Sequence, residues 1–191
     1  MEYKPLIFNN RFERENFLKS NFTKIIGELA VGTLISGGFL TAPASTKFHG
    51  AYEGGLFDHS INVAYILFEL TENNNLQWQS KDRSPWVVGL LHDLCKIDQY
   101  KPILNETGDV IPNRYEWNNN PIVRGHGMKS VIYAQGMGIR LNEEDRACMI
   151  YHMGAFTPEK EWQDYTHAVN IYPNVLWTHQ ADMIVSHIME V

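Results

Sequence analysis

The adjacent residues His92 and Asp93 are the strongest chemical signal in this chain. They lie in the apolar stretch WVVGLLHDLCKIDQY, residues 86–100, which we expect to form a buried helix opened by Ser84 and Pro85. An imidazole and a carboxylate are costly to bury together unless a positive charge, most simply a metal ion, contacts both. A hydrolytic metal centre is therefore the leading hypothesis.

Further histidine and aspartate residues at separate points along the chain would complete such a centre. Neutral imidazole nitrogens and carboxylate oxygens suit borderline divalent ions, whereas thiolate ligands would favour zinc or iron–sulfur chemistry. Taken singly, each of these side chains is more often a hydrogen-bonded core residue than a ligand. The candidate ligands are His59, His92, Asp93, His126, His152 and Asp182.

These ligands belong to separate predicted elements, so a folded helical bundle is needed to bring them together. Apolar residues recur at helical spacing along most of the chain, which predicts an all-α fold. Residues 42–55 have the composition of an ordered loop, and residues 100–121 predict a small hairpin or irregular excursion. Besides the helix that carries His92 and Asp93, the predicted helices cover residues 11–36, 56–72, 128–135, 142–153 and 168–189.

Length and composition narrow the class of protein. A chain of 191 residues that is 44% hydrophobic suits one domain, 1–191, with an N-terminal helical layer (1–40) and a metal-site core (42–187). Its net charge of -6 argues against an extended nucleic-acid surface, so small or short phosphorylated substrates fit better. The two cysteines form no CxxC motif, and no segment has the pattern of a signal peptide or membrane span. We expect a cytoplasmic protein without membrane attachment, and the oligomeric state stays open.

The order of the candidate ligands resembles that of the HD-domain metal-dependent phosphohydrolase superfamily. The resemblance extends over residues 42–187 and rests on the motifs GGLFDHS, LLHDLCK, RGHG, YHMG and ADMI. The stretch APASTKFHGAYEGGLFDHS is most similar to the HD domain of bacterial 3′-5′ exoribonucleases that also carry an OB-fold. That OB-fold has no counterpart here, because the residues before His59 read as helix and loop. The resemblance implies a single HD-domain helical bundle.

The resemblance also implies which of the ligands would hold each metal ion. His59, His92, Asp93 and Asp182 would hold one ion, and Asp93 would bridge to a second ion held by His126 and His152. The chain departs from many relatives by having Cys95 before Lys96, and Met153 after His152. If one ion binds, His126 and His152 would contact a substrate phosphate instead. One or two divalent ions are expected, with Mn, Fe, Ni, Co, Zn and Mg all open.

Asp93 and Lys96 are the predicted catalytic residues. Lys96 lies four residues after His92, so on one helix both would share a face and the ammonium would meet the phosphate. Arg124 and Lys129 flank His126 and are, with Lys96, the candidate substrate-binding cations. The alternative for each cation is an ordinary solvated charge. His49 and Tyr52 are expected near the entrance of the substrate pocket. Phe156 or Trp162 could stack on a base of the substrate.

The function favoured by these residues is metal-dependent hydrolysis of a phosphomonoester or phosphodiester in a nucleotide or short oligonucleotide. The expected nucleophile is a hydroxide that forms near neutral pH because metal coordination lowers the pKa of water. One alternative is a catalytically inactive module that keeps the metal cage and senses a nucleotide. Another is an inert helical scaffold that binds no metal. Measuring metal content distinguishes the inert scaffold from the other two possibilities. Measuring turnover distinguishes the enzyme from the sensing module.

Overall fold

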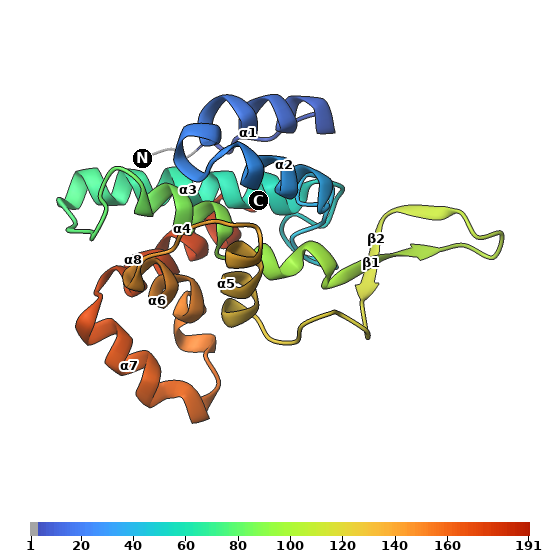
Figure 1. Ribbon diagram of the computed structural model, residues 1–191. Coiled ribbons are helices and arrows are strands. Elements are labelled where there is room, and N and C mark those ends of the chain that lie inside the picture. Colours follow the sequence, from blue (N-terminus) through green and yellow to red (C-terminus); the bar gives the residue numbers. More distant parts are fainter. Residues whose placement is uncertain (1–3) are drawn as a thin grey trace.

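The computed structural model describes residues 4–191 and consists mainly of helices (Figure 1). The all-α prediction is confirmed, and so is a small hairpin within residues 100–121. The helices are α1 (Arg11–Ile26), α2 (Glu28–Ser36), α3 (Gly55–Asn74), α4 (Ser84–Leu91), α5 (Gly127–Gly136), α6 (Glu143–Tyr151), α7 (Trp162–Ile171) and α8 (Asn174–Ile184). The strands are β1 (Tyr100–Leu104) and β2 (Val110–Trp117).

Helix α3 crosses the middle of the fold and packs against α4 and α8. Helices α1 and α2 lie on one side of it, and α6, α7 and α8 lie on the other (Figure 1). The close approach of α3 and α4 depends on Gly89, where an added Cβ would lie 2.3 Å from Cα of Ala64. This packing brings the end of α4 beside the first half of α3.

The N-terminal layer differs from the single helical segment predicted for residues 11–36. Gly27, with φ 92°, ends α1 and the chain turns before α2 begins at Glu28. A residue with a side chain would be strained at this positive φ. The layer is tied to α3 by a buried ion pair, in which Arg14 Nε lies 3.0 Å from Asp58 Oδ1. The hydroxyl of Tyr52 donates to Asp58 Oδ2 at 3.0 Å, which attaches the 42–54 loop to the same carboxylate.

Two predicted helices were wrong in their bounds. The helix that was to carry His92 and Asp93 ends at Leu91, and a 3-10 turn, Leu94–Asp98, follows. The segment 168–189 is divided at Pro173 into α7 and α8, because a proline disfavours helical geometry at the residue before it. A π-helical turn, Val185–Met189, then follows α8.

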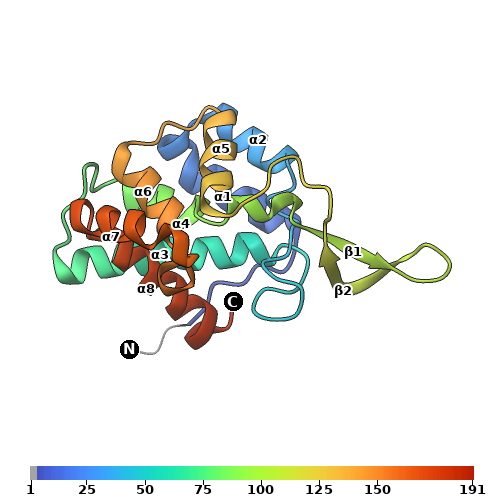
Figure 2. The ribbon, with the colours of Figure 1, turned by 90° about the horizontal axis from the view of Figure 1, so that it is seen from below.

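Strands β1 and β2 form an antiparallel hairpin that projects away from the helices (Figure 2). Tyr100 pairs with Trp117 and Pro102 with Tyr115, but the register then shifts, so that Leu104 pairs with Val110. A cluster of buried hydrophobic side chains extends through the helical part from Leu18 to Val191. Within residues 4–191, no helix combines the length and apolar character needed to cross a membrane.

Candidate metal centre

The structure brings the six predicted ligands together at the ends and inner faces of five helices. His59 and Asp182 lie within α3 and α8, whereas the others lie just beyond the end or before the start of a helix. His59, His92 and His152 are fully buried, and Asp93 is 2% exposed. The candidate ligands and their elements are His59 (α3), His92 and Asp93 (after α4), His126 (before α5), His152 (after α6) and Asp182 (α8).

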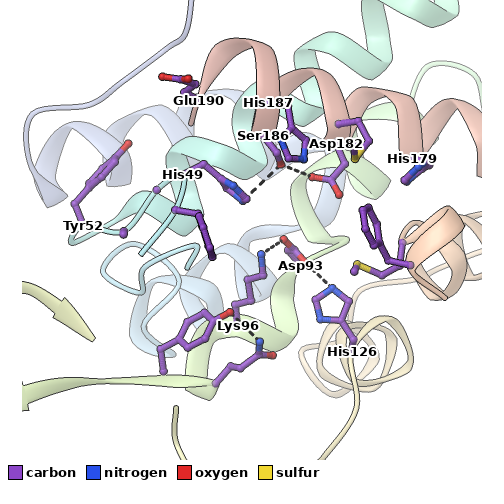
Figure 3. Close-up of a pocket in the computed structure, with 18 of the residues that line it drawn as sticks. His49, Tyr52, Asp93, Lys96, His126, His179, Asp182, Ser186, His187 and Glu190 are labelled. Carbon is purple, nitrogen blue, oxygen red and sulfur yellow. Dashed lines mark hydrogen bonds and ion pairs between the residues drawn. The ribbon is translucent and has the colours of Figure 1, made fainter. Parts of the chain in front are cut away.

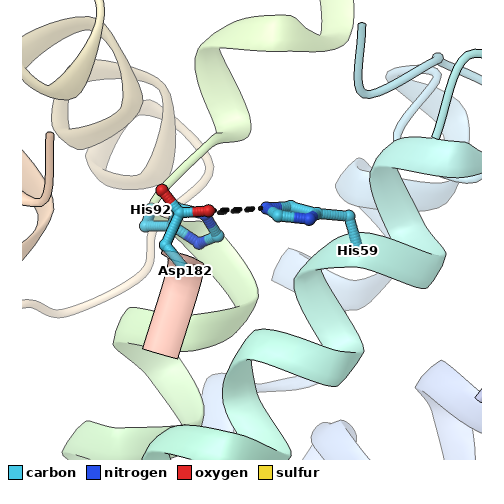
Figure 4. Close-up of side chains that lie close together, drawn as sticks. All are labelled: His59, His92 and Asp182. Atoms are coloured by element: carbon cyan, nitrogen blue, oxygen red, sulfur yellow. Dashed lines mark hydrogen bonds and ion pairs between the residues drawn. The ribbon is translucent and has the colours of Figure 1, made fainter. Parts of the chain in front are cut away.

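One group of ligand atoms is formed by His59, His92 and Asp182 (Figure 4). Nε2 of His59 lies 3.3 Å from Nε2 of His92 and 3.2 Å from Oδ1 of Asp182. Asp93 Oδ2 completes the group at 3.7 Å from His59 Nε2 and 3.5 Å from His92 Nε2. A further separation in this group, between His92 Nε2 and Asp182 Oδ1, is 3.9 Å. Four ligands at about 2.1 Å from a tetrahedral ion lie about 3.4 Å apart, so the group is close to the size that a first-row divalent ion needs.

The other oxygen of Asp93 faces a second pair of imidazoles. Oδ1 lies 3.0 Å from Nε2 of His126 and 3.5 Å from Nε2 of His152. The two ring nitrogens lie 3.1 Å apart. Asp93 therefore stands between two sets of potential ligands and directs one oxygen at each, which is the geometry of a bridging carboxylate.

Three of the imidazoles are held in the orientation that metal binding requires. Each places Nδ1 against a main-chain carbonyl oxygen, which can only accept, so Nδ1 carries the hydrogen and Nε2 keeps its lone pair. The lone pairs then point at one another across the centre, an arrangement that a cation would stabilise. The pairs are His59 with Val191 O (2.8 Å), His92 with Gly89 O (2.8 Å) and His152 with Met149 O (2.7 Å).

Asp93 Oδ1 provides a separate test of whether a cation fits. This buried oxygen has no hydrogen-bond donor in suitable geometry within residues 4–191, although two ring nitrogens lie nearby. A buried carboxylate oxygen without a donor is unfavourable unless another positive group, such as a metal ion, contacts it. The donor set and this oxygen both fit a divalent ion.

Protonation equilibria favour the metal-binding forms of most ligands. Burial lowers the pKa of His92 to about 3 and also lowers the pKa of His126, so both rings are neutral at pH 7. Burial opposes the charge on Asp93, but several neighbouring groups counteract this effect, the charge of Lys96 most strongly, and the pKa of Asp93 lies well below its usual range. For His152, burial lowers the pKa, but the neighbouring carboxylates of Asp93 and Asp182 favour the protonated ring more strongly, so its pKa lies above the ordinary value. A proton therefore competes with a metal most strongly at His152.

Lys96 lies beside the centre, although not on the helix that was expected. It belongs to the 3-10 turn after α4, and its Nζ lies 2.6 Å from Asp93 Oδ2 (Figure 3). Burial tends to lower the pKa of Lys96, but the negative charge of Asp93 raises it above its ordinary value. The side chain therefore carries an ammonium ion at neutral pH, 12% exposed and facing the pocket.

The other two predicted cations do not lie at the pocket. Lys129 is 1% exposed and forms an ion pair with Asp98, with its ammonium 5.3 Å from the centroid of the Tyr133 ring. The expectation that Lys129 contacts substrate is corrected: a buried ammonium needs a carboxylate, and Asp98 provides it. Arg124 is exposed in the loop before α5 and does not line the pocket, so its role stays a prediction.

A pocket of about 1120 Å³ opens in front of the centre. Asp93, Lys96, His126 and Asp182 line it, and so do several residues to which the sequence assigned no role (Figure 3). Ser186 is one of these: its hydroxyl donates to Asp182 Oδ1 at 3.1 Å, and its position one helical turn after Asp182 was the available signal. The others on this C-terminal segment are Met183, His187 and Glu190.

Besides His187, two histidines outside the ligand set line the pocket. His49, expected near the mouth, has its ring centroid 5.2 Å from that of His59 and its Nε2 3.5 Å from Ser186 Oγ. Burial lowers the pKa of His49 to about 4, so this ring is neutral at pH 7. His179 places Nδ1 2.9 Å from the main-chain oxygen of His152. It thereby joins α8 to the turn that carries His152.

A comparison with protein families gives one match, to a model described as the HD domain, over residues 56–185. The matched region includes all six candidate ligands and more than half of the 191 residues. It confirms the resemblance to the HD-domain superfamily. Neither the curated proteins nor the solved structures that were compared contain a significant match.

Proposed function

Because the chain belongs to the HD-domain superfamily of metal-dependent phosphohydrolases, we propose that it hydrolyses a phosphate ester of a nucleotide or short oligonucleotide. The observation that carries the proposal is the position of Asp93. Its two oxygens face two groups of histidine nitrogens at the floor of the pocket. A phosphate that enters this pocket would reach Asp93, His126, Asp182 and Lys96 together.

We propose that the ligands divide between two ions. His59, His92, Asp182 and Asp93 Oδ2 would hold one divalent ion, and Asp93 Oδ1, His126 and His152 a second. When bound, such ions would make hydroxide available from water at neutral pH and neutralise charge on the phosphate. If a single ion binds, His126 and His152 would instead contact a phosphate oxygen.

Lys96 has a distinct proposed role. In hydrolysis, a water oxygen forms a bond to phosphorus, the bond from phosphorus to the ester oxygen breaks, and the departing oxygen takes a proton. The ammonium of Lys96 lines the pocket beside Asp93, where it would stabilise negative charge on the phosphate or the departing oxygen. Its ion pair with Asp93 keeps this charge at the floor of the pocket.

The substrate is proposed to be small or short. A net charge of -6 is unfavourable for binding a long polyanion, because non-specific affinity grows with the number of phosphates that cations neutralise. The pocket, at about 1120 Å³, exceeds the size usual for a single small ligand and would admit a nucleotide with part of a neighbour. Neither the monoester nor the diester class is favoured by these features.

The decisive experiment is product analysis by chromatography after incubation with Mn. The panel contains nucleoside mono-, di- and triphosphates, cyclic nucleotides, and short RNA and DNA, and metal content is measured on the same protein. Asp93→Ala should lose turnover, whereas Asp109→Ala, an exposed aspartate on the hairpin, should not. Turnover that depends on Asp93 supports the proposal.

Two results would overturn it. Tightly bound metal without turnover of any compound would favour a module that senses a nucleotide and keeps the metal cage. A protein that neither binds metal nor turns over a substrate would be an inert scaffold.

A further inference from the structure

The β1–β2 hairpin contributes an aromatic wall to the pocket. Tyr100 and Trp117 are paired across the two strands, and their ring centroids lie 5.0 Å apart at an interplanar angle of 65°. Both residues line the pocket, and Trp117 remains 59% exposed. A tryptophan that is more than half exposed contributes little to a hydrophobic core, so its place at the pocket needs another explanation.

Tyr100 of this aromatic wall lies close to Lys96 in the chain. Lys96, Gln99 and Tyr100 all line the pocket, and they lie within five consecutive residues of the chain. The amide of Gln99 donates to the Tyr100 hydroxyl at 3.1 Å, which fixes the ring at the base of the hairpin. A ligand whose phosphate reaches Lys96 would therefore have its neighbouring group beside Tyr100.

The hairpin also brings a polar residue to the pocket. Between the pairs Pro102–Tyr115 and Leu104–Val110, the four residues 111–114 of β2 lie opposite the single residue 103 of β1. Asn113 lies in this bulge with φ 55°, in the left-handed region, and is one of the residues that line the pocket. Bulges near active sites commonly redirect a side chain, and asparagine tolerates this φ better than most residues.

Aromatic rings also occur on other parts of the pocket lining. Phe48 in the 42–54 loop is 79% exposed, and Phe156 in the turn after α6 is 65% exposed. Phe156 also contacts His179, with ring centroids 6.5 Å apart. A flat ring held among such aromatics gains stacking energy, and an asparagine amide can both donate to and accept from the edge of that ring. A nucleobase is the group with both properties.

From this arrangement we infer that the β1–β2 hairpin is the base-recognition element of the enzyme. Tyr100 and Trp117 stack on a base next to the scissile phosphate, and Asn113 forms hydrogen bonds to its edge. The inference rests on the proposed function and specifies its substrate class: a phosphate ester with an attached nucleobase, rather than a sugar phosphate or a lipid phosphate.

The test compares a dinucleotide with an analogue that has the same sugar–phosphate framework but lacks both bases. Hydrolysis of each is followed by chromatography in the presence of Mn. We expect the wild-type protein to have a kcat/KM about 10-fold or more higher for the dinucleotide. Trp117→Ala should remove most of this difference by raising KM for the dinucleotide alone, and Trp117→Phe should retain most of it.

Asn113→Gly tests the amide separately, since glycine keeps the positive φ while losing the side chain. It should reduce the difference in kcat/KM among dinucleotides that carry the four bases. Val110→Ala is the control, because Val110 is a 57% exposed residue of the same hairpin and does not line the pocket. It should leave all of these values unchanged.

The outcomes separate this inference from the proposed function. Equal hydrolysis of both compounds, or an equal effect of Trp117→Ala on both, would overturn base recognition and leave the phosphohydrolase intact. Loss of the preference in Val110→Ala as well would show that the hairpin acts only through its fold, which also overturns it. If neither compound is hydrolysed but a nucleoside monophosphate of the panel is, the same comparison uses that nucleotide and its analogue without a base. Failure to hydrolyse any compound of the panel would overturn the proposed function and this inference with it.

Discussion

The thiol of Cys95 lies 3.2 Å from Nδ1 of His126, in the place where the other candidate histidine ligands have a main-chain oxygen. Burial raises the pKa of this thiol to about 12, so it stays protonated and is a weak hydrogen-bond partner. His126 is therefore oriented less firmly than His59, His92 or His152. The ion that His126 would hold should be the more weakly bound of the two.

Replacing Cys95 should change the affinity for that ion. Cys95→Ala removes the partner of Nδ1, and loss of such outer contacts typically weakens metal affinity by about 10- to 100-fold. Calorimetric titration of the metal-free protein with Mn should show this loss for one ion only. Cys148→Ala is the matched control, because Cys148 is equally buried and belongs to none of the candidate ligand groups. An equal loss in both variants would mean that packing, not the contact with His126, was responsible.

Lys96→Met should separate charge stabilisation from metal binding. The substitution keeps a long apolar chain and removes the ammonium, which should lower kcat by about 100-fold, the effect typical of losing one group that stabilises transition-state charge. Metal content, measured by mass spectrometry, should not fall. Lys101→Met, at an exposed lysine of β1, should retain full activity. If Lys96→Met loses its metal instead, the side chain acts through Asp93 rather than on the substrate.

Gly89→Ala should destabilise the fold because the added methyl would collide with the main chain of Ala64. Inserting a group into a packed interface costs about 1–3 kcal/mol, and here it would separate α3 from α4. Urea unfolding should show a lower midpoint. Gly32→Ala on α2 meets nothing within 4 Å and should be neutral or stabilising by up to about 1 kcal/mol. A lower midpoint in Gly32→Ala would contradict the steric explanation.

The Asp98–Lys129 ion pair should make stability depend on pH in the acid range. Burial raises the pKa of Asp98, but the hydrogen bonds from Lys129 and Tyr133 lower it below its usual value. The folded state then binds fewer protons than the unfolded state, whose aspartate pKa is about 3.9. The stabilisation is therefore complete above about pH 5 and is lost as the pH falls through the folded pKa.

Asp98→Asn should remove this dependence. It leaves the buried ammonium of Lys129 without its carboxylate, which should cost about 1–3 kcal/mol at pH 7. Urea unfolding between about pH 3 and pH 7 should show a smaller decrease in unfolding free energy than in the wild type. Asp164→Asn, at an exposed position on α7, should behave like the wild type. If the unfolding free energy of Asp98→Asn and of the wild type fell equally with pH, the Asp98–Lys129 ion pair would not be the cause of the pH dependence.

The local character of the chain was largely readable from its sequence. Helical spacing and turn residues predicted the all-α fold and the hairpin, because they reflect short-range conformational preferences and the need to bury one face of each helix. The ligand residues were identifiable for a similar reason: buried imidazoles and carboxylates in apolar surroundings need a compensating charge. The breaks at Gly27 and after Leu91 were missed, because apolar spacing continues across both.

Tertiary structure decided which side chains meet. The sequence placed Lys129 beside His126, but packing of α5 against the 3-10 turn turned its ammonium toward Asp98 instead. Conversely, Ser186 lies far from His49 in the chain and yet faces it in the pocket. By itself, the sequence determined which residues can bind metal and which segments form helices, since both are properties of residue types and their neighbours. The position of Asp93 between two groups of histidine nitrogens and the place of Asn113 at the pocket depended on contacts between distant elements, which local preference does not specify.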